Sequence, residues 1–129
     1  MPRSRRRRLA VIKALHTAVF LSELASILWL VVTGLVGRRD RSVALAAVLV
    51  STESAVFVLN RGVCPLTPLA ERYGAASGSV SDIFLPDVVA RTIPIWASTL
   101  VVIGAALHLR GLLRRRLQVG LVSQQGLEP

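Results

Sequence analysis

Residues 53–68 read Glu-Ser-Ala-Val-Phe-Val-Leu-Asn-Arg-Gly-Val-Cys-Pro-Leu-Thr-Pro, and within them an apolar segment gives way to a polar turn. Glu53 lies inside the apolar segment, where burial in a membrane disfavours a carboxylate. The chain leaves the segment through Asn60 and Arg61 and enters a tight turn from Cys64 to Pro68. Because apolar runs lie on both sides of this stretch, the sequence predicts a helical frame around it.

The distribution of charge indicates a membrane protein more clearly than the overall composition does. Hydrophobic residues make up 53% of the 129 residues, compared with about 45–50% in soluble domains. The length allows one domain, and nearly all charges lie in four patches separated by long uncharged runs. The single Cys64 rules out an internal disulfide framework.

Three apolar runs are candidates for transmembrane helices, because roughly 17–25 apolar residues in a helix cross a bilayer. They cover about 14–36, 43–59 and 93–113. The other segments are a basic N-terminal flank (1–13), a loop (60–92), and a basic stop with a mobile tail (114–129). The connection between the first two runs is so short that they must be antiparallel neighbours. The predicted fold is therefore an all-α integral membrane protein of three antiparallel transmembrane helices, with a structured loop between helices two and three.

A basic start followed by an apolar run could also be a secretory or twin-arginine signal. The first run is longer than the roughly 7–15 apolar residues of a signal peptide, and no typical small-residue cleavage site follows it. An uncleaved first helix is therefore the favoured interpretation.

The loop contains signals for short helices. Thr67 and Pro68 predict a helix start, with Thr67 as the cap and Pro68 as the first residue. Gly74 predicts the end of this helix, because glycine favours the left-handed conformation there. Pro86 and Asp87 predict a further helix start.

The placement of arginine predicts the orientation and the partners. Nine basic residues collect on the N-terminal side of the predicted bundle and seven on the other side. The positive-inside rule then favours a cytoplasmic N-terminus and a cytoplasmic Cys64 turn. The expected location is the cell inner (plasma) membrane, which the chain crosses several times. The net charge of +9 does not indicate nucleic acid, because the basic residues lie at the ends of apolar runs and aromatic side chains are few. The lipid bilayer is the expected partner, together with a homo-oligomer or a larger membrane complex, since three helices bury little surface.

Polar residues of separate spans fall at similar depth and form a candidate site. His16 and Glu23 share one stripe of the first helix, and Glu53 and Asn60 share a stripe of the second. At a rise of ~1.5 Å per residue, Glu23 lies ~13 Å and Glu53 ~10 Å from the same membrane face. Because a mid-membrane charge costs roughly 2.5–3.5 kcal/mol, His16, Glu23 and Glu53 are predicted to hold a proton or a cation. In the structural alternative, Glu53 hydrogen-bonds between helices and water satisfies His16.

Metal and haem sites are disfavoured by the same placement. One Cys and two His are too few for a closed zinc site of Cys and His ligands. His108 is expected at the membrane face opposite His16, so one protomer could not easily clamp a haem iron between them. Neither a metal nor a cofactor is expected. Cys64, near Arg61 and a helix start, could be a reactive thiol, although a packing role in a proline-fixed turn is favoured.

The sequence contains an ordered set of residue types: a histidine in the first helix, an Asn shortly before Cys-Pro-Leu-Thr, an acidic and basic pair, and a glycine. The matching residues are His16, Asn60, Cys64, Pro65, Leu66, Thr67, Glu71, Arg72 and Gly74. The pattern resembles a family of small bacterial multi-pass membrane proteins of unknown function. It departs from that family at residues 69–71, where the family places Leu and Glu adjacent. The resemblance implies a helical integral membrane protein and supplies no activity.

Three functions are compatible with these residues. The favoured one is a non-enzymatic accessory or assembly component with a polar intramembrane cluster. The alternative is a small proton- or cation-coupled membrane transporter using Glu23 and Glu53, and the second alternative is a membrane enzyme using Cys64 with His16. The motif loop that accompanies the cluster comprises Asn60, Arg61, Cys64, Pro65, Leu66, Thr67 and Glu71.

Overall fold

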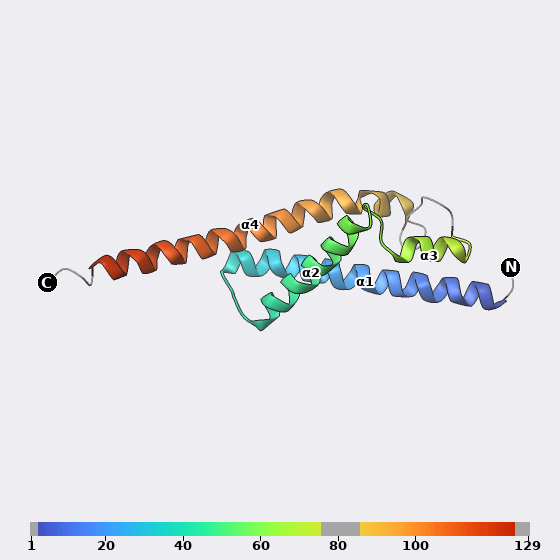
Figure 1. Cartoon of the computed structure of the whole chain (residues 1–129), viewed down its shortest axis with the longest axis horizontal. Coiled ribbons are helices and arrows are strands. Elements are labelled where there is room, and N and C mark those ends of the chain that lie inside the picture. The colour runs from blue at the N-terminus through green and yellow to red at the C-terminus, as the bar shows by residue number, and fades with distance from the viewer. Residues whose placement is uncertain (1–2, 76–85, 126–129) are drawn as a thin grey trace.

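The computed structural model describes residues 3–75 and 86–125, and this part of the chain is helical with loops between the helices (Figure 1). The elements are α1 (Arg3–Val36), α2 (Arg41–Leu59), α3 (Leu66–Arg72) and α4 (Asp87–Gln125). No strand occurs within the two described ranges. The predicted all-α fold is therefore confirmed.

Three of the helices are long and apolar enough to cross a membrane: α1, α2 and the 91–125 part of α4. Each of them carries many exposed Leu and Val side chains. Contiguous apolar surface of this kind marks a membrane or protein contact rather than a surface that faces water. The prediction of three membrane-length apolar helices is confirmed, whereas their antiparallel passage through a bilayer stays a prediction.

Two helices extend well beyond the predicted spans. α1 begins at Arg3 instead of near residue 14, and α4 covers Asp87–Gln125 instead of 93–113. Arginine is a good helix former, so the charges that mark the end of an apolar span do not end the helix. At ~1.5 Å per residue both helices are about 50–60 Å long, which exceeds the hydrocarbon core of about 30 Å. Residues 117–125, predicted as part of the tail, are helical, and 126–129 lie outside the described residues.

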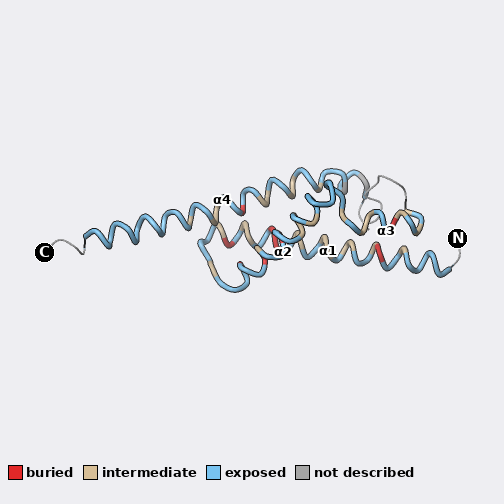
Figure 2. The backbone as a smooth tube through the Cα atoms, in the orientation of Figure 1, coloured by how far each residue is buried: buried red, intermediate tan, exposed pale blue. Residues whose placement is uncertain are grey.

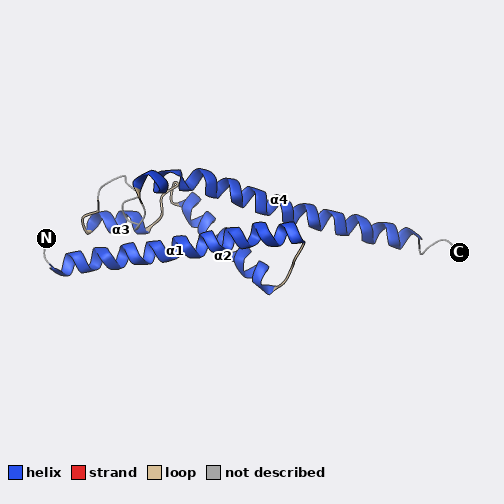
Figure 3. Cartoon of the chain, turned by 180° about the vertical axis from the view of Figure 1, so that it is seen from behind, coloured by secondary structure: helices blue, strands red, loops and turns tan. Residues whose placement is uncertain are grey.

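The other three helices pack against α1. α4 runs beside it in the same direction, and α2 crosses it obliquely (Figure 1). The few buried residues lie mainly on α1 and α2, while most of α4 is exposed (Figure 2). The short α3 lies along the N-terminal part of α1 (Figure 3). Because α2 and α4 pack mainly on α1 and not on each other, space remains between them on both sides of the crossing.

The contact between α1 and α4 is especially close at Gly34. A Cβ atom at this position would lie only 2.8 Å from Cβ of Leu107. Beside it, Nε2 of His108 lies 3.0 Å from the carbonyl oxygen of Leu30 and 3.3 Å from the hydroxyl of Thr33. Since a carbonyl oxygen only accepts hydrogen bonds, Nε2 of His108 carries the proton. The close approach at Gly34 and the hydrogen bond from His108 together hold α4 against α1.

Asp40 caps α2 in the turn that joins it to α1. Its carboxylate accepts hydrogen bonds from Arg38, from the Ser42 hydroxyl, and from the backbone N–H groups of Ser42 (2.9 Å) and Val43 (3.3 Å). The hydrogen bond from the Ser42 side chain, followed by that from Arg38, lowers the pKa of Asp40 from 3.8 to about 2. The ionised carboxylate therefore satisfies backbone donors that the first turn of α2 would otherwise leave open.

Asp40→Ala is expected to lower the melting temperature in detergent. Asp40→Asn keeps a capping side chain, so it should lower the melting temperature less than Asp40→Ala does. Because its folded-state pKa is lowered, the carboxylate stabilises the fold fully above pH 3.8, and this stabilisation is lost as the pH falls through about 2. Melting curves across this range should show less acid sensitivity for Asp40→Asn than for the wild type. Equal sensitivity of the two proteins would contradict this role of Asp40.

Candidate functional site

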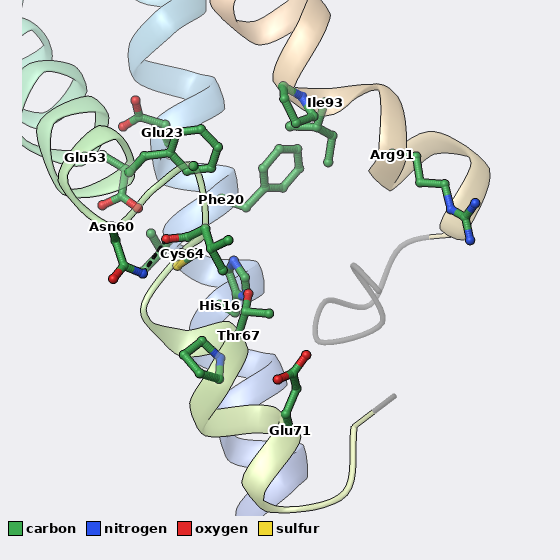
Figure 4. A pocket seen from close by; sticks show the side chains of 16 residues that line it. His16, Phe20, Glu23, Glu53, Asn60, Cys64, Thr67, Glu71, Arg91 and Ile93 are labelled. Atoms are coloured by element: carbon green, nitrogen blue, oxygen red, sulfur yellow. Dashed lines mark hydrogen bonds between the residues drawn. The ribbon is translucent and has the colours of Figure 1, made fainter. Parts of the chain in front are cut away.

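A cavity of about 730 Å³ lies between α1, α2, the connection that leads into α3, and the first turns of α4 (Figure 4). It gathers residues that are far apart in the sequence. The lining residues are His16, Val19, Phe20, Glu23, Glu53, Phe57, Asn60, Gly62, Val63, Cys64, Thr67, Pro68, Glu71, Arg91, Ile93 and Pro94. All three residues of the predicted polar cluster are among them.

Helical spacing explains how α1 and α2 deliver acidic side chains to one space. His16, Phe20 and Glu23 lie four and three residues apart, so they share one stripe of α1. Glu53 and Phe57, four residues apart, share a stripe of α2 in the same way. Figure 4 shows Glu53 of α2 beside Glu23 of α1, with Phe20 and His16 following along α1. The two stripes inferred from the sequence therefore face the same cavity.

The acidic pair is the main electrostatic feature of the cavity. Glu23 and Glu53 both line the cavity, and both side chains are only partly exposed. Like charges repel strongly where the dielectric constant is low, so a bound proton or cation relieves the repulsion. Phe20 and Phe57 supply aromatic rings to the same wall, and aromatic faces attract organic cations.

The end of α2 shapes the wall of the cavity that follows Glu53. The N–H of Gly62 donates to the carbonyl of Phe57 at 2.8 Å, and the N–H of Arg61 donates to that of Val58 at 3.1 Å. This pair of hydrogen bonds forms a Schellman motif, which needs a left-handed residue just after the helix. Arg61 occupies that position with φ 59°, although glycine is the usual residue there.

Asn60 and Cys64 organise the turn between α2 and α3. The side-chain amide of Asn60 donates to the carbonyl of Val63 at 2.7 Å, a hydrogen bond typical of an Asn in a turn. The N–H of Thr67 donates to the carbonyl of Cys64 at 2.9 Å, which closes the first turn of the next helix. Both hydrogen bonds fix the backbone that carries Cys64 along the cavity.

α3 begins earlier than the sequence predicts. Its first residue is Leu66 and its N-cap is Pro65, whose side chain makes no capping hydrogen bond. The prediction of Thr67 as the cap and Pro68 as the first residue is therefore wrong by two positions. The proline ring presets the helical φ at Pro65, and the carbonyl of Cys64 accepts from the N–H of Thr67 at 2.9 Å. The predicted end at Gly74 is confirmed, since Gly74 follows the helix with φ 102°.

Arginines of the basic N-terminal flank, which is part of α1, contact the C-terminal end of α3. Ala70 is completely buried, and the Arg5 guanidinium donates to the carbonyl of Arg72 at 3.0 Å. The guanidinium of Arg8 lies 5.8 Å from the ring centre of Tyr73. Because α1 continues as a helix through this flank, its arginines hold the cavity wall that α3 forms.

Not every predicted site residue reaches the cavity. Arg61, Pro65 and Leu66 do not line it, whereas the remaining residues of the cluster and the motif loop do. Three residues of α4 that the sequence does not predict as part of the site close the cavity on that side: Arg91, Ile93 and Pro94. Arg91 is the last charged residue before the third apolar run, so its predicted depth would have placed it at the same end as Asn60.

Arg61→Gly is expected to raise the free energy of unfolding by about 1 kcal/mol, because glycine adopts the left-handed conformation without strain. Gly37 and Gly74 occupy the equivalent positions after α1 and α3, with φ of 70° and 102°. Gly74→Arg serves as the reverse change and should lower stability by a similar amount. Unfolding of the purified variants in detergent, followed by tryptophan fluorescence, measures both. A less stable Arg61→Gly protein would show that the Arg61 side chain stabilises the turn.

The described residues contain no group of three His, Cys, Asp or Glu side chains that could hold a metal ion. Cys64 and His16 line the same cavity, but a membrane enzyme using Cys64 stays a prediction, which Cys64→Ser tests.

No protein-family model, curated protein or solved structure matches this chain. The resemblance carried by residues 60–74 therefore also stays a prediction, and the function is argued from the cavity.

Proposed function

We propose that this chain is an integral membrane protein of three antiparallel spans with a cytoplasmic N-terminus, and that it binds a proton or a small organic cation at Glu23 and Glu53. A small cation-coupled transporter uses a site of this kind. The observation that carries the proposal is that two carboxylates from different helices, Glu23 of α1 and Glu53 of α2, line one cavity of about 730 Å³.

The composition of the cavity supports an organic cation over a metal ion. The walls are mostly apolar and include the rings of Phe20 and Phe57, which suit a cation with hydrocarbon or aromatic groups. Metal ions instead need several oxygen, nitrogen or sulfur ligands at short distance, and the described residues contain no such group. The Glu23–Glu53 pair would then exchange a proton for the organic cation.

Binding of tetraphenylphosphonium to the purified protein tests this proposal. We expect binding that strengthens as the pH rises, because protons compete for the two carboxylates. Glu53→Gln should weaken binding by about tenfold or more, since it removes the charge but keeps the shape. Asp40→Asn, at the other end of the bundle, is the matched control and should bind as the wild type does. Equal binding by Glu53→Gln and the wild type would overturn the proposal.

A second candidate is an accessory or assembly component of a larger membrane complex. It is favoured by α4, whose residues from Leu112 to Val122 are all exposed, including several large apolar ones. A partner helix could cover this surface. Cross-linking in native membranes should then yield products larger than the monomer, and recovery of monomer alone would count against this candidate.

A further inference from the structure

A groove of about 490 Å³, separate from the cavity at Glu23 and Glu53, lies between α2 and α4 near the turn that joins α1 to α2. Its walls are mainly apolar, with Val43, Ala47 and Val50 on α2 and Val101 and Ala105 on α4. Leu30 of α1 contributes to its lining as well. The groove exists because both helices pack on α1 and because small side chains face the space between them.

The groove has about the length of one bilayer leaflet. Its lining residues on α4 extend from Val101 to Leu112, which corresponds to about 16 Å at ~1.5 Å per residue. Half of a hydrocarbon core of about 30 Å is about 15 Å. A single acyl chain that lies along the groove would therefore reach from the headgroup region to the middle of the bilayer.

Arg39 marks the headgroup end of the groove. Its guanidinium donates to the carbonyl of His108 at 2.8 Å, and it lies against Gly111 of α4. This hydrogen bond fixes the guanidinium, which has five N–H donors and so keeps others available for a phosphate. Asp40 also lines the groove, but its carboxylate is paired with Arg38 and caps α2.

We propose that this groove binds an anionic phospholipid, with one acyl chain between α2 and α4 and the phosphate at Arg39. Charge complementarity favours this occupant over a second copy of the chain. The sequence around this end contains seven arginines (38, 39, 41, 110 and 114–116) and one acidic residue, Asp40. A second copy seated in the groove would bring the same positive charges together, whereas an anionic headgroup neutralises them.

Lipid retention by the full-length protein tests the proposal. The protein is purified in detergent with equal amounts of phosphatidylglycerol and phosphatidylcholine, and the retained lipids are identified by native mass spectrometry. We expect the wild type to retain phosphatidylglycerol preferentially. Arg39→Gln should reduce this preference about fivefold. Arg41→Gln, which removes a neighbouring exposed arginine outside the groove lining, should change it less than about twofold.

A second pair of variants changes the shape of the groove without changing its charge. Ala47→Leu places a larger side chain in the groove and should release the lipid, while Ala55→Leu makes the same change on α2 at a residue that lines neither cavity. Equal retention of both lipids by the wild type, equal losses in Arg39→Gln and Arg41→Gln, or full retention by Ala47→Leu would each overturn the proposal. Disulfide-linked dimers formed through Ala47→Cys in a Cys64→Ser background would overturn it as well, in favour of a second copy.

Discussion

Gly34→Leu is expected to separate α4 from α1 and to lower the free energy of unfolding by about 2–3 kcal/mol. Even the Cβ atom of the new residue would lie 2.8 Å from Cβ of Leu107 and 3.4 Å from the His108 ring. Cβ of Leu107 is bound to the backbone and cannot swing away, so the whole helix must move. The movement would also break the hydrogen bond from His108 to Leu30.

Gly120→Leu is the matched control for this substitution. It lies on the same α4 helix, and a Cβ atom there meets nothing within 4 Å. We expect Gly120→Leu to be neutral or slightly stabilising, because leucine favours the helix more than glycine does. Unfolding in a denaturing detergent, monitored by tryptophan fluorescence, compares the two variants. Equal stability of the two would mean that α4 does not pack on α1 at Gly34.

Reversing one charge of the Glu23–Glu53 pair is expected to change the free energy of unfolding differently from reversing both charges. Glu53→Lys replaces repulsion by attraction to Glu23, and Glu23→Lys does the same toward Glu53. The double variant has two like charges again, so the favourable interaction of each single variant is lost. We expect a coupling free energy of about 1–3 kcal/mol between the two substitutions.

A double-mutant cycle on the free energy of unfolding measures this coupling. Glu23→Lys combined with Arg110→Glu provides the control cycle, because Arg110 lies toward the other end of the bundle, next to the Gly111 that contacts Arg39. That control cycle should be additive within about 0.5 kcal/mol. Additive effects of Glu23→Lys and Glu53→Lys would show that the two carboxylates do not interact. Each single reversal should also abolish the binding of tetraphenylphosphonium, since the site would then carry no net negative charge.

The three apolar helices and much of the cavity could be predicted from local patterns. Long uncharged runs indicate membrane-length helices whatever their packing. The spacing of His16, Phe20 and Glu23 places them on one stripe, and counting residues from a shared membrane face brings Glu53 to a similar depth. Both features follow from the helical repeat and from an antiparallel neighbour, and neither depends on how the helices pack.

The remaining features depend on three-dimensional packing that a single sequence does not specify. The close contact at Gly34 requires the register of α4 against α1, which places Leu107 opposite it. The position of Arg91 in the cavity depends on where α4 begins relative to α1. The sequence underestimates the length of α1, because the N-terminal arginines mark where the apolar span begins and not where the helix begins. The groove at Arg39 follows from the oblique crossing of α2, which no local pattern indicates.

Labelling of single cysteines in intact cells tests the three-span arrangement most directly. Cys64 follows α2, and a cysteine at Arg41→Cys in a Cys64→Ser background precedes it, so the two positions should lie on opposite sides of the membrane. We expect a membrane-impermeant maleimide to label Arg41→Cys in intact cells and to label Cys64 only after permeabilisation. The reverse result would keep the three spans and invert their orientation. Labelling of both positions under the same condition would contradict the passage of α2 through the membrane, and with it the cavity as an intramembrane site.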